Sequence, residues 1–162
     1  MSTKPIICNT SPLIGLSGIN SLSLLRDLYT EVWIPREVEN EFLAIDETIH
    51  REILNNAPWI ITVDLADQQK VEVYEGIDGG EAEVLALAKE HEAVLVFIDE
   101  KKARQVAQDI GLIVKGTVGI LLEAKKNGLV DAIEPLLIEL QNNGMRLSKA
   151  LIDFALRVAD EI

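Results

Sequence analysis

Apolar and polar residues follow two alternating patterns along this chain. Continuous apolar runs of strand length occupy residues 5–9, 31–34, 59–63, 94–98 and 112–114. Between them, segments of helical type begin near residues 11, 21, 35, 46, 66, 81, 100 and 117, and two more helices are predicted at about 131–142 and 147–160. The Gly79-Gly80 pair is expected to break the chain before the helix at 81–90. Strands that alternate with helices predict an α/β fold whose parallel sheet is covered on both faces.

Length and composition favour one globular domain over residues 1–162. The 48% hydrophobic and 26% charged residues are ordinary for a globular protein. The single cysteine, Cys8, excludes an intrachain disulfide and lies in an apolar run, so we expect a buried thiol and a reducing, cytoplasmic location. No apolar run approaches the roughly 20 residues of a membrane span, so we expect no membrane association.

Four segments place a carboxylate or an amide where an apolar run ends. Asn9 and Asp99 end the first and fourth runs, each directly before a helix start. Glu81 lies on the core-facing stripe of its helix, and Glu41 borders the apolar stripe of the helix that begins at Pro35. In a parallel α/β sheet, side chains at the carboxyl ends of strands share one edge, where their oxygens can hold Mg²⁺ or Mn²⁺. Since such an ion makes water attack a phosphodiester, we expect a metal site with nuclease chemistry.

Each of these residues also has a purely structural interpretation. Asp99 is placed to cap the helix that follows it, and Glu81 to interact with the dipole at the start of its own helix. For Glu41, in a segment rich in carboxylates, a solvated acidic helix face is the simpler explanation. The hydroxyls of Ser11 and Thr117 open helices, and they serve either as caps or as groups that hold a water or a phosphate oxygen.

The charge of the chain is unevenly distributed. Its net charge of −12 argues against a surface that binds nucleic acid everywhere. Residues 101–126, however, contain six basic and two acidic residues, and the segment starts soon after Asp99. It forms either a solvated face or a rim that attracts phosphate beside an acidic pocket. In the second case Lys101, Lys102 and Arg104 would steer an RNA backbone toward the site.

Five segments, taken in order, resemble the PIN-domain superfamily, and within it a prokaryotic subfamily of PIN-like nucleic-acid-binding proteins. They are ICNTSPLIGL, IPREVENEF, GEAEVLALA, VFIDEKKARQVA and GTVGILLEAKKNGL. The resemblance covers about residues 5–130 and leaves out the C-terminal helices at about 131–160. It implies a three-layer α/β/α Rossmann-like sandwich and an Mg²⁺- or Mn²⁺-dependent endoribonuclease. Many relatives are toxins of toxin–antitoxin modules, so it also implies RNA as substrate, a small antitoxin protein as partner and a homodimer.

The resemblance also assigns the site, residue by residue. Most relatives have Asp where this chain has Asn9, whose amide oxygen still binds Mg²⁺ but brings no charge and cannot act as a general base. The assigned residues are Asn9, Glu41, Glu81 and Asp99 for the metal, the last three of these for catalysis, and Ser11 and Thr117 in support.

Two other functions stay open at this point. Asn9 raises the alternative of a catalytically impaired PIN-like module that binds RNA or a partner protein. A small-molecule phosphatase or phospho-acceptor domain would need an acid at the end of the first strand, and the sequence NTSPL supplies none. Apolar residues of the last two helices serve either as core or as a docking surface for a partner; they are Leu136, Leu137, Leu140, Leu151, Phe154, Ala155 and Val158.

Overall fold

The computed structural model describes residues 4–71 and 74–162 of the chain. Within them, one sheet has the strand order β3-β2-β1-β4-β5, and every neighbouring pair is parallel. Its strands are β1 (Ile6–Cys8), β2 (Val32–Pro35), β3 (Ile60–Val63), β4 (Leu95–Phe97) and β5 (Val114–Lys115). This all-parallel sheet confirms the predicted α/β fold.

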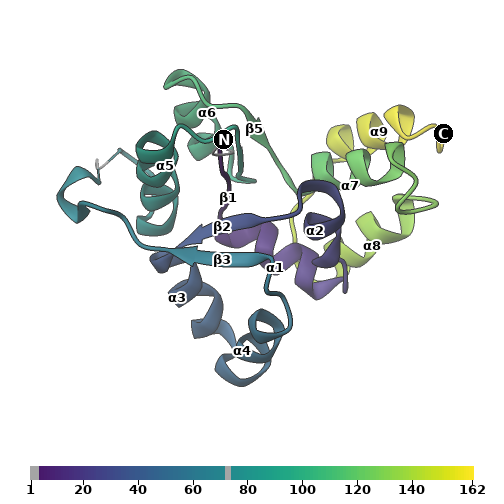
Figure 1. Cartoon of the computed structure of the whole chain (residues 1–162). Coiled ribbons are helices and arrows are strands. Elements are labelled where there is room, and N and C mark those ends of the chain that lie inside the picture. The colour runs from purple at the N-terminus through teal and green to yellow at the C-terminus, as the bar shows by residue number, and fades with distance from the viewer. Residues whose placement is uncertain (1–3, 72–73) are drawn as a thin grey trace.

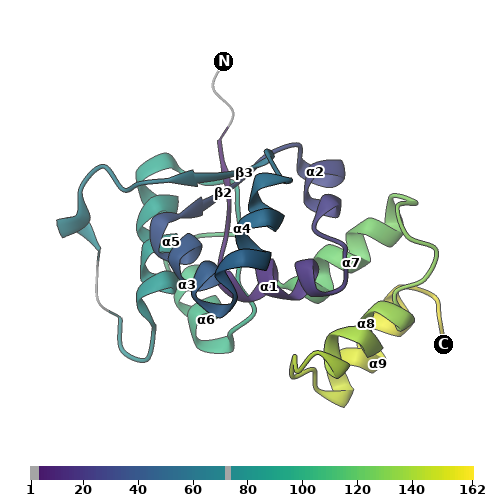
Figure 2. The ribbon, with the colours of Figure 1, turned by 90° about the horizontal axis from the view of Figure 1, so that it is seen from below.

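Helices connect the strands and cover the sheet, which gives the predicted three layers. Figure 1 shows α5 and α6 to one side of the sheet and α1, α2 and α7 to the other. The hairpin of α8 and α9 stands beyond α7, apart from the sheet (Figure 2), and α9 contacts α7. The helices are α1 (Thr10–Gly18), α2 (Ser23–Tyr29), α3 (Arg36–Ile45), α4 (Glu47–Asn55), α5 (Gly79–His91), α6 (Lys101–Asp109), α7 (Thr117–Lys126), α8 (Glu134–Asn142) and α9 (Lys149–Val158), with a 3₁₀ helix η1 (Gln68–Lys70).

The centre of the core lies on the two middle strands, β1 and β4. Ile7, Cys8, Val96 and Phe97 are fully buried, and Cys8 pairs with Phe97 across the two strands. The apolar runs form strands here because helices cover both faces of a parallel sheet. Burial, with the charge of Asp99, raises the pKa of the Cys8 thiol, so this cysteine is an inert core residue, as predicted.

Two predicted boundaries around α5 are wrong. The polar helix expected at 66–75 is reduced to the three residues of η1, and residues 72 and 73 lie outside the described range. Gly79 and Gly80 do not interrupt the chain before the helix but form its first two residues. The helix can start there because the Asp78 side chain accepts a hydrogen bond from its first turn.

Smaller differences affect the C-terminal half. The strand expected at 112–114 begins later, since β5 spans Val114–Lys115. Leu112 does not belong to it, because its N–H donates to the carbonyl oxygen of Ala107 and closes the end of α6. The last two helices are a few residues shorter than expected. Among the described residues, no helix is both long and apolar enough to cross a membrane.

The apolar residues of the last two helices are divided between core and surface. Leu137, Leu140 and Ala155 are buried, so ordinary packing explains them. Phe154 and Val158, by contrast, are each 57% exposed. Of these residues, only the exposed ones, which lie on α9, can belong to a docking surface for a partner.

Candidate active site

The carboxyl ends of β1 and β4 position the first two candidate residues. Asn9 directly follows β1, and its N–H donates to the carbonyl oxygen of Phe97 at 2.9 Å. Asp99 stands just beyond the end of β4. The chain leaves β1 toward β2 on one side, while β4 lies on the other, so this edge is the topological switch point of the sheet. Ligands of open α/β sheets bind at such a point.

Three hydrogen bonds fix the carboxylate of Asp99. The N–H of Thr117 donates to Oδ1 at 2.7 Å, the Thr117 hydroxyl to Oδ2 at 2.7 Å, and the Ser11 hydroxyl to Oδ2 at 3.1 Å. The N-cap residues of the two helices are Asn9 and Gly116 instead. The interpretation of Ser11 and Thr117 as helix caps is therefore wrong, because their hydroxyls orient Asp99.

Asp99 does not cap α6, the helix that follows it. The N-cap of α6 is Glu100, whose carboxylate accepts a hydrogen bond from the N–H of Ala103 at 2.9 Å. Asp99 turns away from its own helix toward side chains of α1 and α7. The sequence placed this carboxylate correctly at a strand end, but its partners come from distant segments.

Glu81 projects from the first turn of α5 and is only 5% exposed. It forms a capping box with Asp78: Asp78 Oδ1 accepts from the N–H of Glu81 at 2.8 Å, and Glu81 Oε1 accepts from the N–H of Asp78 at 3.1 Å. Burial raises the pKa of Glu81, and the nearby charges of Asp78, Glu100 and Glu41 raise it further. Glu81 thus stabilises the start of its helix while its carboxylate lies among other acids.

Glu41, on α3, is half-buried and does not belong to a solvated face. The Thr10 hydroxyl donates to its Oε1 at 3.0 Å. The carboxylate lies against Gly80, where a Cβ atom would stand 1.9 Å from Oε1, so a larger residue at this position would displace the carboxylate. Burial raises the pKa of Glu41, and the charge of Asp78 adds to this, although the bond from Thr10 opposes it. The solvated-face interpretation is wrong for this residue.

One pocket of about 870 Å³ brings the candidate residues together, and we call it the acidic pocket. Its wall includes Asn9, Ser11, Glu41, Glu81 and Asp99, which come from four separate segments of the chain. Thr117 supports the wall from behind through its bonds to Asp99.

The acidic pocket also contains residues that the sequence pattern did not single out. Asp78 and Glu100 add two carboxylates, and Arg146 adds a cation. The DGGE sequence at residues 78–81 is a capping-box pattern, which was a usable signal for Asp78. No sequence pattern indicated Arg146, because this residue reaches the acidic pocket only through the packing of the α8–α9 hairpin against α7.

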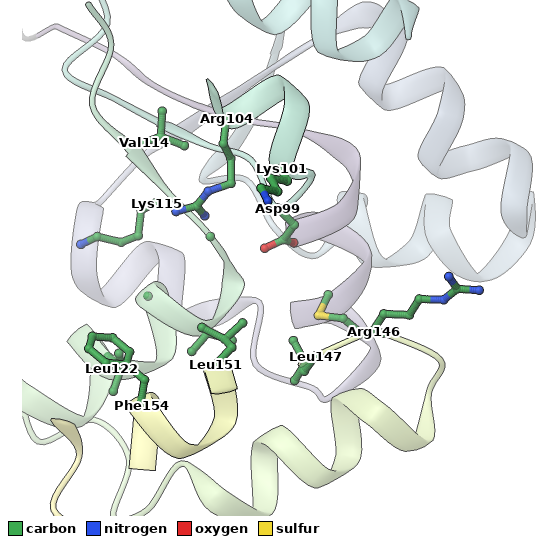
Figure 3. A pocket seen from close by; sticks show the side chains of 14 residues that line it. Asp99, Lys101, Arg104, Val114, Lys115, Leu122, Arg146, Leu147, Leu151 and Phe154 are labelled. Carbon is green, nitrogen blue, oxygen red and sulfur yellow. The ribbon is translucent and has the colours of Figure 1, made fainter. Parts of the chain in front are cut away.

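The three predicted RNA-steering residues do not lie together. Lys101 and Arg104 line, with Asp99, a second pocket of about 380 Å³ (Figure 3). Lys102 extends to another loop, where a Cβ atom on Gly76 would stand 2.3 Å from its Nζ. Of these three residues, only Lys101 and Arg104 therefore place positive charge beside Asp99.

The rest of the basic segment 101–126 does not form a continuous rim. Lys115 pairs with Glu123, and the Lys125 amino group lies 2.9 Å from Glu161. The Glu123 carboxylate also accepts a hydrogen bond from Tyr29 at 2.6 Å. These lysines are therefore partly neutralised by structural contacts.

The acidic pocket offers oxygen ligands without forming a closed cage. Across residues 4–71 and 74–162, no three His, Cys, Asp or Glu side chains converge closely enough to enclose a metal ion. Carboxylate and amide oxygens are nevertheless the ligands that Mg²⁺ prefers, and this ion usually keeps several waters. The crowding that raises the pKa values of Glu41 and Glu81 is also relieved by a cation. The residues therefore fit a hydrated divalent ion.

Comparison with known families agrees with this geometry. A family model described as a PIN domain matches residues 5–161, so the chain belongs to the PIN-domain family. Membership indicates a nuclease-type, nucleic-acid-binding function, and PIN domains generally use divalent metal ions. The match also takes in α8 and α9, which the sequence resemblance had left out. Neither a curated protein nor a solved structure matches the chain.

Proposed function

We propose that the protein is a divalent-metal-dependent endoribonuclease whose active site is the acidic pocket. The observation that carries this proposal is the meeting of Asn9, Glu41, Glu81 and Asp99 at the edge where β1 and β4 end. A nuclease-type function follows from the family. RNA as the substrate, and cleavage within the strand, are the proposed refinements.

The residues of the acidic pocket would have different roles in the reaction. Glu41, Glu81 and Asp99 would hold Mg²⁺ or Mn²⁺, and Asn9 would add an uncharged oxygen ligand. When bound, the ion would lower the pKa of a water molecule, and so provide a nucleophile for phosphorus at neutral pH. Thr117 keeps Asp99 in a single orientation, so this ligand needs little rearrangement.

Substrate binding would rely on local rather than overall charge. The net charge of −12 repels RNA at a distance, whereas Lys101 and Arg104 place positive charge beside Asp99. Because these contacts are to phosphates, the affinity for RNA should fall as salt is added.

The first experiment tests the metal site without a substrate. Calorimetric titration with Mn²⁺ should give one binding event in the wild type, and at least tenfold weaker binding in Glu81→Gln and Asp99→Asn, the scale expected when a ligand-shell residue is changed. Gln retains the capping box and Asn retains an acceptor for Thr117, so both variants should fold. Glu52→Gln, an exposed carboxylate on α4, is the matched control and should bind as the wild type does. Equal binding by all four proteins would refute the site.

The second experiment tests the reaction. Wild-type protein should cleave a single-stranded RNA in Mn²⁺ but not in EDTA, and Asp99→Asn should be inactive in both. Cleavage by Asp99→Asn at the wild-type rate would show that the activity lies elsewhere.

Asn9 supports a second candidate, a module that binds RNA or a partner but no longer cleaves. Asn9 is 5% exposed and brings no charge to a site where a carboxylate would strengthen metal binding. Asn9→Asp discriminates between the two functions. A large gain in cleavage rate in Asn9→Asp would support an enzyme that Asn9 impairs. A variant that binds Mn²⁺ more tightly yet does not cleave RNA would support the binding module.

The antitoxin partner and the homodimer stay predictions based on resemblance. A toxin role predicts that expression of the wild type arrests cell growth and that Asp99→Asn does not. Light scattering of the purified protein would give the molar mass that decides between monomer and dimer.

A further inference from the structure

We infer that the pocket in Figure 3 is a subsite for one unpaired nucleotide of the RNA, with its base against α9 and its phosphate beside Asp99. This inference rests on the proposed function, and it deepens it by assigning a binding site for one base next to the cleaved bond. We call this pocket the nucleotide pocket.

The nucleotide pocket lies between two parts of the fold. One wall comes from α6, β5 and α7, and the other from α9 with the segment that precedes it. Its volume of about 380 Å³ is within the range of roughly 300–1,000 Å³ that is usual for small-ligand pockets. A single nucleotide is a ligand of that scale.

The two ends of the nucleotide pocket have different chemistry. Lys101 and Arg104 lie beside Asp99 at one end, and Leu122 and Phe154 lie at the other (Figure 3). A nucleotide has the same division, because its phosphate is anionic and its base is a flat ring with apolar faces. Arg is well suited to the phosphate, since its planar guanidinium donates several hydrogen bonds to one anion.

Phe154 is the side chain that points to a base. It is 57% exposed although it is a large aromatic residue, and Leu151 beside it is 37% exposed. An aromatic ring that stays exposed at the wall of a pocket offers a stacking surface, and stacking tolerates any base because every base has a π-face. The chain has only seven aromatic residues in all, so its sequence favours a single stacking position over an extended row of aromatic rings.

The nucleotide pocket adjoins the acidic pocket. Asp99, Met145 and Arg146 line both of them. A strand whose phosphodiester lies at Asp99 would therefore place a neighbouring nucleotide in the second pocket. In a duplex, the bases are stacked and paired inside the helix and cannot enter, so this arrangement selects unpaired RNA.

Charge favours a nucleotide over an apolar peptide as the occupant. Apart from Lys115, which pairs with Glu123, the lining contains three cationic side chains and one carboxylate, in a chain whose net charge is −12. An apolar segment of a partner protein would use the leucines and Phe154 but would have no need of Lys101 and Arg104 next to Asp99. The peptide is therefore the alternative that the experiment has to exclude.

The test measures the affinity of a fluorescein-labelled single-stranded RNA decamer by fluorescence anisotropy in EDTA. Phe154→Ala should weaken binding about fivefold or more, the lower end of what one stacked base contributes. Because Phe154 is exposed, this variant should keep the circular dichroism spectrum of the wild type. Ile138→Ala is the matched control, since Ile138 is 50% exposed on α8 and outside the pocket. It should bind as the wild type does.

A second probe separates the base from the backbone. A decamer of abasic sugar phosphates should bind wild-type protein and Phe154→Ala equally, because it has nothing to stack on the ring. The inference is overturned if Phe154→Ala binds the RNA decamer as tightly as the wild type, or if it loses affinity equally for both probes. It is also overturned if wild-type protein does not bind the RNA decamer.

Two further results distinguish this inference from its rivals and from the proposed function. A change of molar mass in Phe154→Ala with unchanged RNA affinity would assign the surface to a protein partner or a second copy, and would overturn the inference. Weakened decamer binding by Phe154→Ala in a protein that fails the Mn²⁺ titration would support the subsite while refuting the metal-dependent nuclease. The two proposals can therefore fail separately.

Discussion

The carboxylates on the two sides of the acidic pocket lie in opposite electrostatic surroundings. On the β4 side, Asp99 accepts hydrogen bonds from Ser11 and from both donors of Thr117. On the α5 side, Glu81 lies close to other carboxylates, and burial together with their charges raises its pKa. One side of the pocket is supplied with donors, and the other with further negative charge.

This difference suggests that the two sides of the acidic pocket have separate roles in binding an ion. A carboxylate held by several donors keeps its orientation, so Asp99 is suited to fix the position of a bound group. Carboxylates that repel one another are costly in the folded protein unless a cation lies between them. The α5 side is thus where an ion would gain most of its binding energy, and the β4 side is where its position would be determined.

The largest expected effect is stabilisation by the ion itself. At a Mn²⁺ concentration of 100 times Kd, the free energy of unfolding should rise by about 2.7 kcal/mol. Glu81→Gln removes one of the mutually repelling charges and, with at least tenfold weaker binding, should lose about half of this gain or more, while Glu52→Gln should keep it. Urea unfolding with and without Mn²⁺ measures the difference. An ion that stabilises Glu81→Gln as much as the wild type would remove the contrast between the two sides.

On the donor side, Thr117→Val should lower the free energy of unfolding by about 2 kcal/mol, since it removes a buried hydrogen bond to a charged group. Ser11→Ala should cost less, because Ser11 is half-buried and both Thr117 bonds to Asp99 remain. Equilibrium urea denaturation gives both values. If Thr117→Val unfolds at the wild-type midpoint, the Thr117 hydroxyl does not hold Asp99 in solution.

Glu161 is a reference carboxylate that is fully paired but distant from the pocket. It accepts hydrogen bonds from the N–H groups of Ile133 and Glu134, at the start of α8, and from the Lys125 amino group. Burial acts to raise the pKa of Glu161, but these three bonds outweigh it and lower the pKa. Through these hydrogen bonds, its carboxylate links the C-terminal residues to α7 and to the start of α8.

Glu161→Gln should cost about 1 kcal/mol of stability at pH 7 without changing Mn²⁺ binding. A lowered pKa in the folded state means that the stabilisation is complete above the ordinary pKa of 4.5 and is lost as the pH falls through the folded value. The unfolding curves of the variant and the wild type should therefore converge in acid. A gap that widens below pH 4.5 would contradict this assignment.

The smallest change in stability is expected from a pair of neighbouring glycines. Gly80→Ala would place a Cβ atom 1.9 Å from Oε1 of Glu41, so the flexible carboxylate must move, whereas in Gly79→Ala the nearest atom is 3.9 Å away. Both variants should change the free energy of unfolding by no more than about 1 kcal/mol. Only Gly80→Ala should weaken Mn²⁺ binding in calorimetry. Equal affinities for the two variants would show that the position of Glu41 is unimportant to the ion.

Much of the fold follows from short-range pattern. The apolar runs around Ile7 and Val96 are continuous because both faces of a parallel sheet are covered, so their length and composition predict buried strands. The positions of Asn9 and Asp99 follow from the same runs, since the end of a strand is a local property. The start of α5 was misplaced because the capping box of Asp78 outweighs the low helix propensity of two glycines.

The sequence by itself determined the class of fold, the two strand ends that meet at the switch point, and the inert character of Cys8. Only the tertiary structure decided which groups those side chains contact. Ser11 and Asp99 are separated by 88 positions, and Thr10 and Glu41 by 31, so no periodicity links them. Helical spacing cannot distinguish a carboxylate that faces water from one that faces another helix, so for Glu41 it left a solvated face as the simpler interpretation. The partners of a polar side chain depend on how distant elements pack, and that packing is a property of the whole core.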